Sequence, residues 1–177
     1  MNILRKTILV ASVLLAGCMS VDIPTDASTF NVEPQRLAHL KPQQQSIVLR
    51  NGYSGSNKVS YKINNVSWVL DQEQFTNTAI AMLGRALEKQ GVKVAPSAEK
   101  VITLRVRVLG AGLRIYPFVG VASARVGLEA NLAGVGEFYV ESENGSPGGA
   151  TRAFDGAVLF TLNQLLEDPK FVAYMNR

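Results

Sequence analysis

The sequence predicts an α+β fold in which two helices pack on one face of an antiparallel sheet. Residues 101–109 alternate between apolar and polar side chains, the period of a half-buried strand. Residues 72–90 and 153–167 instead repeat apolar side chains at helical spacing. The resulting order, which is strand, helix, three strands, helix, favours helices gathered on one side of a sheet.

The first helix is predicted over residues 72–90. Its apolar stripe is Phe75, Ala79, Met82, Leu83, Ala86 and Leu87. Asp71 can cap the first turn, with Gln74 at the spacing of a capping box. Gly91 is placed to end the helix in a left-handed conformation.

The β segments are marked by alternation and by turn residues. Residues 46–50 form a short β-prone run that Asn51-Gly52 stops, and residues 58–69 read as one half-buried strand. After the strand at 101–109, Gly110 and Gly112 permit a turn or a bulge. A second long stretch covers residues 113–133, where Pro117 marks an edge or a bend, and a third covers 137–143.

The last helix is predicted to start near residues 153–155, with Asp155 as a cap, and to end at Asp168-Pro169. A short final turn at residues 170–175 carries Phe171 and Tyr174.

The N-terminus has the order of a secretory signal peptide. Arg5 and Lys6 precede an apolar or small run over residues 7–15, and small residues then lead to Cys18. The run is about half the length that a membrane-spanning helix requires. The alternative is an ordinary signal followed by a cysteine that is buried in the fold.

Leu15-Ala16-Gly17-Cys18 resembles the lipobox of bacterial lipoproteins. The resemblance implies cleavage between Gly17 and Cys18 and acyl chains on Cys18, which would anchor the protein in a membrane. Met19 stands where an inner-membrane lipoprotein commonly has Asp, so we expect the outer membrane, with the protein facing the periplasm. The predicted divisions are a signal peptide (1–17), a lipidated tether (18–45) and one α+β domain (46–177). The alternative for part of the tether is that Phe30, Val32 and Leu37, which are apolar, dock it on the domain.

A family resemblance rests on Phe75-x3-Ala79-x2-Met82-x3-Ala86-Leu87-x3-Gly91-Val92-x-Val94, the strand 101–109 and Asp155-x-Ala157-x3-Thr161-x3-Leu165-x2-Asp168-x2-Phe171. This pattern resembles the YajG-like group of small bacterial lipoproteins and, more loosely, auxiliary lipoproteins of envelope ABC transport systems. The resemblance implies an envelope protein and supplies no catalytic residue that matches a position here.

Composition argues against several classes of function. Two of the 18 basic residues lie in the signal peptide, which leaves 16 against 14 acidic residues, so no nucleic-acid partner is indicated. Acylation of the single cysteine would leave no thiol for a disulfide or a metal. His39 is the only histidine and lies in the tether, so we expect no metal, no cofactor and no enzymatic activity.

Two groups of residues are candidates for binding. Arg105 and Arg107 share one strand face, and Arg114 and Arg125 can lie on the same sheet; forked guanidinium groups suit carboxylate or phosphate partners. The alternative is a solvated sheet face on which glutamates pair with the arginines. Tyr116 and Phe118 flank Pro117 in a possible apolar tip for a protein or a lipid, the alternative being an edge that folds back onto the core.

These features predict a non-catalytic, membrane-anchored interaction module that binds a protein partner and assists envelope transport, assembly or maintenance. The alternative function is direct binding of a lipid or an anionic ligand between the helices and the sheet.

Overall fold

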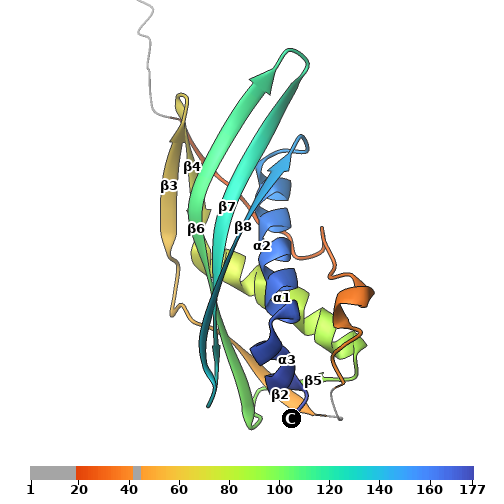
Figure 1. Cartoon of the computed structure of the whole chain (residues 1–177). Coiled ribbons are helices and arrows are strands. Elements are labelled where there is room, and N and C mark those ends of the chain that lie inside the picture. The colour runs from red at the N-terminus through yellow and green to blue at the C-terminus, as the bar shows by residue number, and fades with distance from the viewer. Residues whose placement is uncertain (1–18, 42–44) are drawn as a thin grey trace, which may run out of the picture.

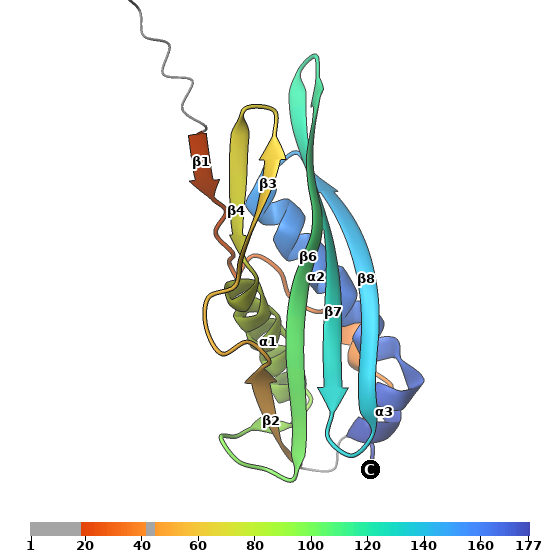
Figure 2. The ribbon, with the colours of Figure 1, turned by 90° about the vertical axis from the view of Figure 1, so that its left-hand side faces the viewer.

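In the computed structural model, which describes residues 19–41 and 45–177, helices cover one face of a long twisted sheet and a smaller sheet stands beside it (Figures 1 and 2). This arrangement confirms the predicted α+β class. The predicted signal peptide, its cleavage site and Cys18 lie outside the described residues. None of the described helices is long and apolar enough to cross a membrane.

The larger sheet has the strand order β5-β2-β6-β7-β8. Its strands are β2 (Ser46–Asn51), β5 (Lys93–Val94), β6 (Lys100–Tyr116), β7 (Val119–Leu132) and β8 (Gly136–Ser146). The three long strands are antiparallel, as the sequence predicts, and β2 joins the sheet in parallel with β6 and β5. A helix lies between β2 and β6 in the chain, so the chain returns to the same end of the sheet before β6 begins.

The predicted stretch 113–133 is not one strand, because β6 continues from the predicted strand 101–109 through the glycines to Tyr116 and β7 forms the rest. Pro117 and Phe118 form the turn of a hairpin in which Tyr116 pairs with Val119. The register between β6 and β7 shifts between Val108 and Gly110, which confirms a bulge at the predicted glycines.

The smaller sheet has the order β1-β4-β3, from β1 (Met19–Asp22), β3 (Lys58–Ile63) and β4 (Val66–Asp71). The prediction of one strand over residues 58–69 is therefore wrong. The segment is a hairpin that turns at Asn64, whose φ is 56°. Asparagine tolerates this left-handed conformation better than most residues, so the turn leaves the alternating pattern intact on both sides.

The first helix, α1 (Gln72–Lys89), ends one residue before its predicted limit. Asp71 caps it by accepting a hydrogen bond from the backbone N–H of Glu73 at 3.1 Å, and Gly91 has the predicted positive φ, 81°. Two further helices, α2 (Ala150–Glu167) and α3 (Pro169–Met175), follow β8. Because α2 starts earlier than predicted, Asp155 lies inside the helix and is not its cap.

The core lies between these helices and the larger sheet. Phe75 of α1 and Phe154 of α2 pack with their ring centroids 5.5 Å apart, and the alternating residues of β6 face them. Fully buried side chains in this layer include Phe75, Leu83, Leu87, Ile102, Leu104, Val106, Val126, Leu128, Phe154, Leu162 and Leu166.

The N-terminal segment lies against the domain, although an extended tether was expected over residues 18–45. β1 pairs with β4, a short 3-10 helix (Pro34–Leu37) follows, and Ile23, Val32, Leu37 and Leu40 are buried in the core. The apolar residues are spaced irregularly because the segment crosses the surface as loop. The alternative that part of the segment docks on the domain is therefore confirmed at Val32 and Leu37.

Candidate functional site

None of the described helices lies over the second face of the three long strands, and we call this the outer face (Figure 1). Arg105 and Arg107 of β6 are exposed on it, as predicted. Arg125 of β7 is exposed there too and pairs in register with Glu143 of β8. By register Arg114 lies on the same face, further along β6 toward the hairpin end, so the structure places all four candidate arginines on one side of the sheet.

Glutamates on the same face neutralise two of these arginines. Arg107 Nε lies 2.7 Å from Glu129 Oε1, and Arg125 Nε donates to Glu141 Oε2 at 3.1 Å. Hydrogen bonds from Tyr139 and Arg125 lower the pKa of Glu141, so this carboxylate stays ionised. The alternative interpretation, a solvated face with paired charges, therefore accounts for Arg107 and Arg125. The outer face is a charge-balanced surface.

Tyr139 is the aromatic centre of the outer face. Its hydroxyl donates to Glu141 Oε1 at 2.8 Å, and its side chain is half exposed. The hydroxyl end of the ring lies over Gly127 of β7, since a Cβ at that position would lie only 2.5 Å from the Tyr139 hydroxyl oxygen. The glycine leaves room for the ring in this position, and the sequence pattern did not indicate the contact.

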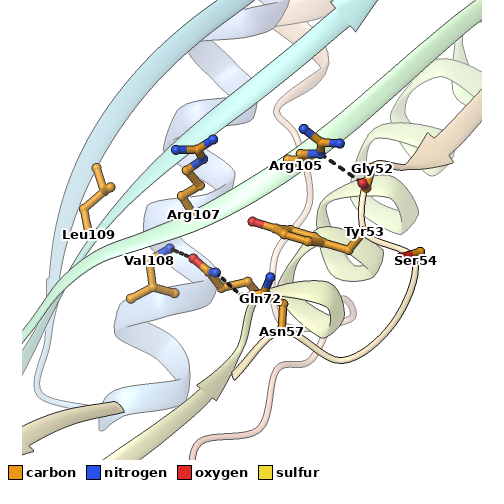
Figure 3. A pocket seen from close by; sticks show the side chains of 9 residues that line it. All are labelled: Gly52, Tyr53, Ser54, Asn57, Gln72, Arg105, Arg107, Val108 and Leu109. Atoms are coloured by element: carbon orange, nitrogen blue, oxygen red, sulfur yellow. Dashed lines mark hydrogen bonds between the residues drawn. The ribbon is translucent and has the colours of Figure 1, made fainter. Parts of the chain in front are cut away.

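Arg105 and Arg107 also line an open pocket of about 510 Å³ beside the edge of β6 (Figure 3). Arg105 Nε donates to the carbonyl oxygen of Gly52 at 2.9 Å, which holds the loop after β2 against the strand. Tyr53 projects from that loop across the pocket, and its hydroxyl donates to the Val106 carbonyl oxygen at 3.3 Å.

The pocket exists because β2 ends at Asn51 and none of the described strands pairs with the next stretch of β6 on this side. The backbone N–H and C=O groups on that edge of β6 form hydrogen bonds with side chains instead, because buried backbone polar groups need partners. The amide of Val106 donates to Thr76 Oγ1 (2.8 Å), that of Val108 donates to Gln72 Oε1 (2.8 Å), and the Val108 carbonyl accepts from the Tyr61 hydroxyl (2.8 Å). These partners come from α1 and β3, and sequence reasoning missed all of them.

Arg114, Tyr116 and Phe118 lie apart from this group, at the end of the β6–β7 hairpin. Phe118 is fully exposed and Ile115 is 74% exposed. The interpretation in which this segment folds back onto the core is wrong, because every residue from 113 to 120 is exposed. The predicted apolar tip is therefore present, and Arg114 is exposed on its strand.

The groups that a catalytic interpretation would need have structural partners. His39 Nε2 lies 2.8 Å from the Leu166 carbonyl oxygen. Asp71 caps α1 and also accepts hydrogen bonds from the Ser56 hydroxyl and the Asn57 amide. Within residues 19–41 and 45–177, no group of three or more His, Cys, Asp or Glu residues is arranged to hold a metal ion. We therefore assign no reaction to these side chains.

Asp155 is fully buried and joins α2 to the N-terminal segment. Its Oδ1 accepts from the Thr25 hydroxyl at 2.6 Å and its Oδ2 from the Asp26 amide at 3.1 Å. Burial raises the pKa of this carboxyl, and the two hydrogen bonds act against that rise. The residue fastens the segment that leads to Cys18.

No family model and no curated protein matches this chain. Two solved structures are similar in part. Protein XCC0632 from Xanthomonas campestris, of the family DUF330, is 15% identical over 84% of this chain and 90% of its own, with a TM-score of 0.46. A neuraminyllactose-binding hemagglutinin homolog from Helicobacter pylori is 12% identical over 77% of this chain and 93% of its own, with a TM-score of 0.41. Likeness at this level transfers no function.

Proposed function

We propose that this protein is a non-catalytic, lipid-anchored module of the bacterial cell envelope that binds a protein partner through its outer face. It would stand on the periplasmic side of the outer membrane and assist transport, assembly or maintenance there. The observation that carries the proposal is the face of β6, β7 and β8 over which no described helix lies, with Tyr139 held at its centre by Glu141 and lying over Gly127.

The outer face suits a protein partner because its side chains are already fixed. Tyr139 is held by Glu141 and rests on Gly127, so binding would cost little side-chain entropy at the ring. Tyr and Arg are enriched among the residues that contribute most to protein interfaces. Arg107 and Arg125, with their glutamate partners, lie on the same face as the ring and would add directional polar contacts.

The alternative function, a lipid or anion held between the helices and the sheet, has less support. Phe75, Leu83 and Leu162 are fully buried in that layer, and close-packed side chains occupy the space that a ligand would need. A ligand there would have to displace core residues.

The outer face is tested by reversing its charges. Arg105→Glu combined with Arg107→Glu should abolish recovery of a stoichiometric partner after cross-linking in the envelope and purification in mild detergent. Lys89→Glu combined with Arg152→Glu changes the net charge equally at exposed positions of α1 and α2, off the outer face, and should retain the partner. The control should melt within a few degrees of the parent, since exposed substitutions typically change stability by about 0.5 kcal/mol or less. The outer-face variant also loses the Arg105–Gly52 hydrogen bond and places like charges beside Glu129, so a circular dichroism spectrum matching that of the parent must accompany its loss of the partner.

A second variant, Tyr139→Ala, removes the ring without changing the charge. It should weaken recovery of the same partner. If both outer-face variants recover the partner as well as the parent does, the outer face is only solvated sheet and the proposal is wrong.

The anchor is tested separately with Cys18→Ser. This variant cannot carry a thioether-linked diacylglycerol, so it should leave the outer-membrane fraction as an unprocessed or soluble product. Partition identical to that of the parent would show that Cys18 does not anchor the protein.

A further inference from the structure

We propose that the end of the β6–β7 hairpin, residues 113–119, enters the lipid surface on which the protein is anchored. This membrane contact goes beyond the proposed function, which concerns the outer face and a protein partner. It uses the proposed anchor only to identify which end of the molecule faces the membrane.

The hairpin end presents large apolar side chains to solvent. Phe118 is fully exposed and sits in the two-residue turn, so its whole side chain projects from the fold. The exposed fractions of its neighbours are 74% for Ile115, 50% for Tyr116, 43% for Val119 and 37% for Leu113. Contiguous apolar exposure of this kind marks a binding or membrane-contact surface. Because the strands stay paired up to Tyr116 and Val119, the apolar end is held out rigidly.

The hairpin end and the lipid anchor belong to the same end of the molecule. Met19 pairs with Val66 at the start of β4, beside the β3–β4 turn. Figures 1 and 2 both place this turn and the β6–β7 hairpin end toward one end of the molecule, with the C-terminus at the other, and Figure 2 shows the start of β1 at the same end as the turn. Cys18 precedes Met19 directly, so acyl chains on Cys18 would enter the membrane at the end from which Phe118 projects.

The charges at this end suit anionic lipid headgroups. Residues 108–124 contain no acidic side chain and one basic residue, Arg114; residues 59–70 likewise contain no acid and one base, Lys62. Both basic side chains are exposed. Each basic residue close to an anionic membrane favours binding. Tyr116 has the amphipathic ring that is enriched at the boundary between headgroups and acyl chains.

The shape of the hairpin end favours a lipid surface over a protein. A convex, fully exposed Phe118 can bury all its sides by entering a soft apolar phase, whereas a protein partner would need a matching deep pocket. The acyl anchor would already hold this end against lipid, so entry of the tip would be an intramolecular step at high effective concentration.

The test uses the full-length lipidated protein, reconstituted in vesicles of phosphatidylethanolamine and phosphatidylglycerol. Acylated Cys18 does not react with maleimides, so Phe118→Cys can carry a single environment-sensitive nitrobenzoxadiazole dye. The dye emission should shift to shorter wavelength and should be quenched by spin-labelled lipids in the bilayer. The same dye at Ala133→Cys, in the exposed β7–β8 turn, should report water and remain unquenched. Ile115→Cys provides a second position at the hairpin end and should behave like position 118.

Each outcome decides for or against the proposal. Quenching at 118 and 115, but not at 133, supports lipid entry. Aqueous emission at 118 on vesicle-bound protein overturns it, and so does a shifted emission that spin-labelled lipid does not quench, which would mean contact with protein or with a second copy. Failure of the anchor is distinguishable, because it appears as loss of the protein from the vesicles and not as a water-exposed dye on bound protein.

Discussion

The hydrogen bond from Thr25 to Asp155 gives a sharp test of how the N-terminal segment is attached. Thr25→Val keeps the shape of the side chain and removes the donor. The buried Asp155 carboxylate would then retain only the Asp26 amide, so one of its oxygens would lose its partner in a site without access to water. Loss of a hydrogen bond to a charged buried group costs about 1.5–3 kcal/mol. For a chain of this length, 2 kcal/mol lowers the melting temperature by roughly 6 °C.

The effect should depend on pH in a defined direction. Burial raises the pKa of Asp155 in the folded state above its ordinary value of 3.8, so the folded protein holds this proton more tightly than the unfolded chain does. The resulting stability is fully present below pH 3.8 and is lost as pH rises through the folded-state pKa. Thr25→Val removes a bond that favours the ionised form. Its cost should therefore be largest at neutral pH and should shrink as the pH approaches the pKa from above.

The assay is chemical unfolding of the parent, Thr25→Val and Thr25→Ser across this pH range. Thr25→Ser retains the hydroxyl and is the matched control, so the difference between the two variants isolates the donor. A valine-serine difference that is negligible at pH 7, or that does not change with pH, would refute the assignment of Thr25 as the partner that offsets the burial of Asp155.

Two further substitutions test the core and the side-chain hydrogen bonds along the edge of β6. Leu83→Ala removes a fully buried side chain from α1 and should reduce the free energy of unfolding by about 2–5 kcal/mol; a chemical melt that barely moves would contradict its place in the core. Thr76→Val removes the acceptor of the Val106 amide and should reduce the free energy of unfolding by about 1–3 kcal/mol. It should also accelerate hydrogen exchange at that amide, and unchanged exchange would show that Thr76 does not protect the β6 edge.

The elements that could be predicted from the sequence are those with a strong local pattern. The limits of α1 follow from an apolar stripe, Asp71 at one end and Gly91 at the other, and all three act locally. The alternation in residues 101–109 likewise identified the strand and the side of it that faces the helices. Pro117 gave the position of a bend, although only the structure shows that the bend is a hairpin turn.

Strand partners and loop packing depend on distant residues and could not be read locally. Nothing in residues 46–50 shows that β2 pairs in parallel with β6, because that choice is set by the path of the chain through α1. Asp155 looks like a helix cap in sequence, yet it binds Thr25 and Asp26 about 130 residues away. The same long-range contact explains why the polar segment 19–41 lies on the domain.

In the candidate site, too, features with a local pattern could be predicted and contacts between strands could not. Arginines at alternate positions of one strand place Arg105 and Arg107 on one face, and exposed residues around Pro117 follow from a hairpin end. The ion pair of Arg107 with Glu129 and the contact of Tyr139 with Gly127 depend on the register between strands. Sequence reasoning therefore found the arginines and raised their pairing with glutamates as the alternative, and only the strand register shows which glutamate pairs with which arginine.

The two proposals together define how the domain would stand on the membrane. An anchor at Cys18 fixes one point, and a point attachment alone leaves the domain free to pivot about it. The β6–β7 hairpin end is a second point at the same end of the molecule, and the three long strands run away from it toward the C-terminal end (Figure 2). With both points at the lipid surface, the strands would rise from the membrane and the outer face would look sideways. A protein partner would then meet Tyr139 by approaching alongside the membrane, so loss of the hairpin contact should weaken partner binding without altering any residue of the outer face.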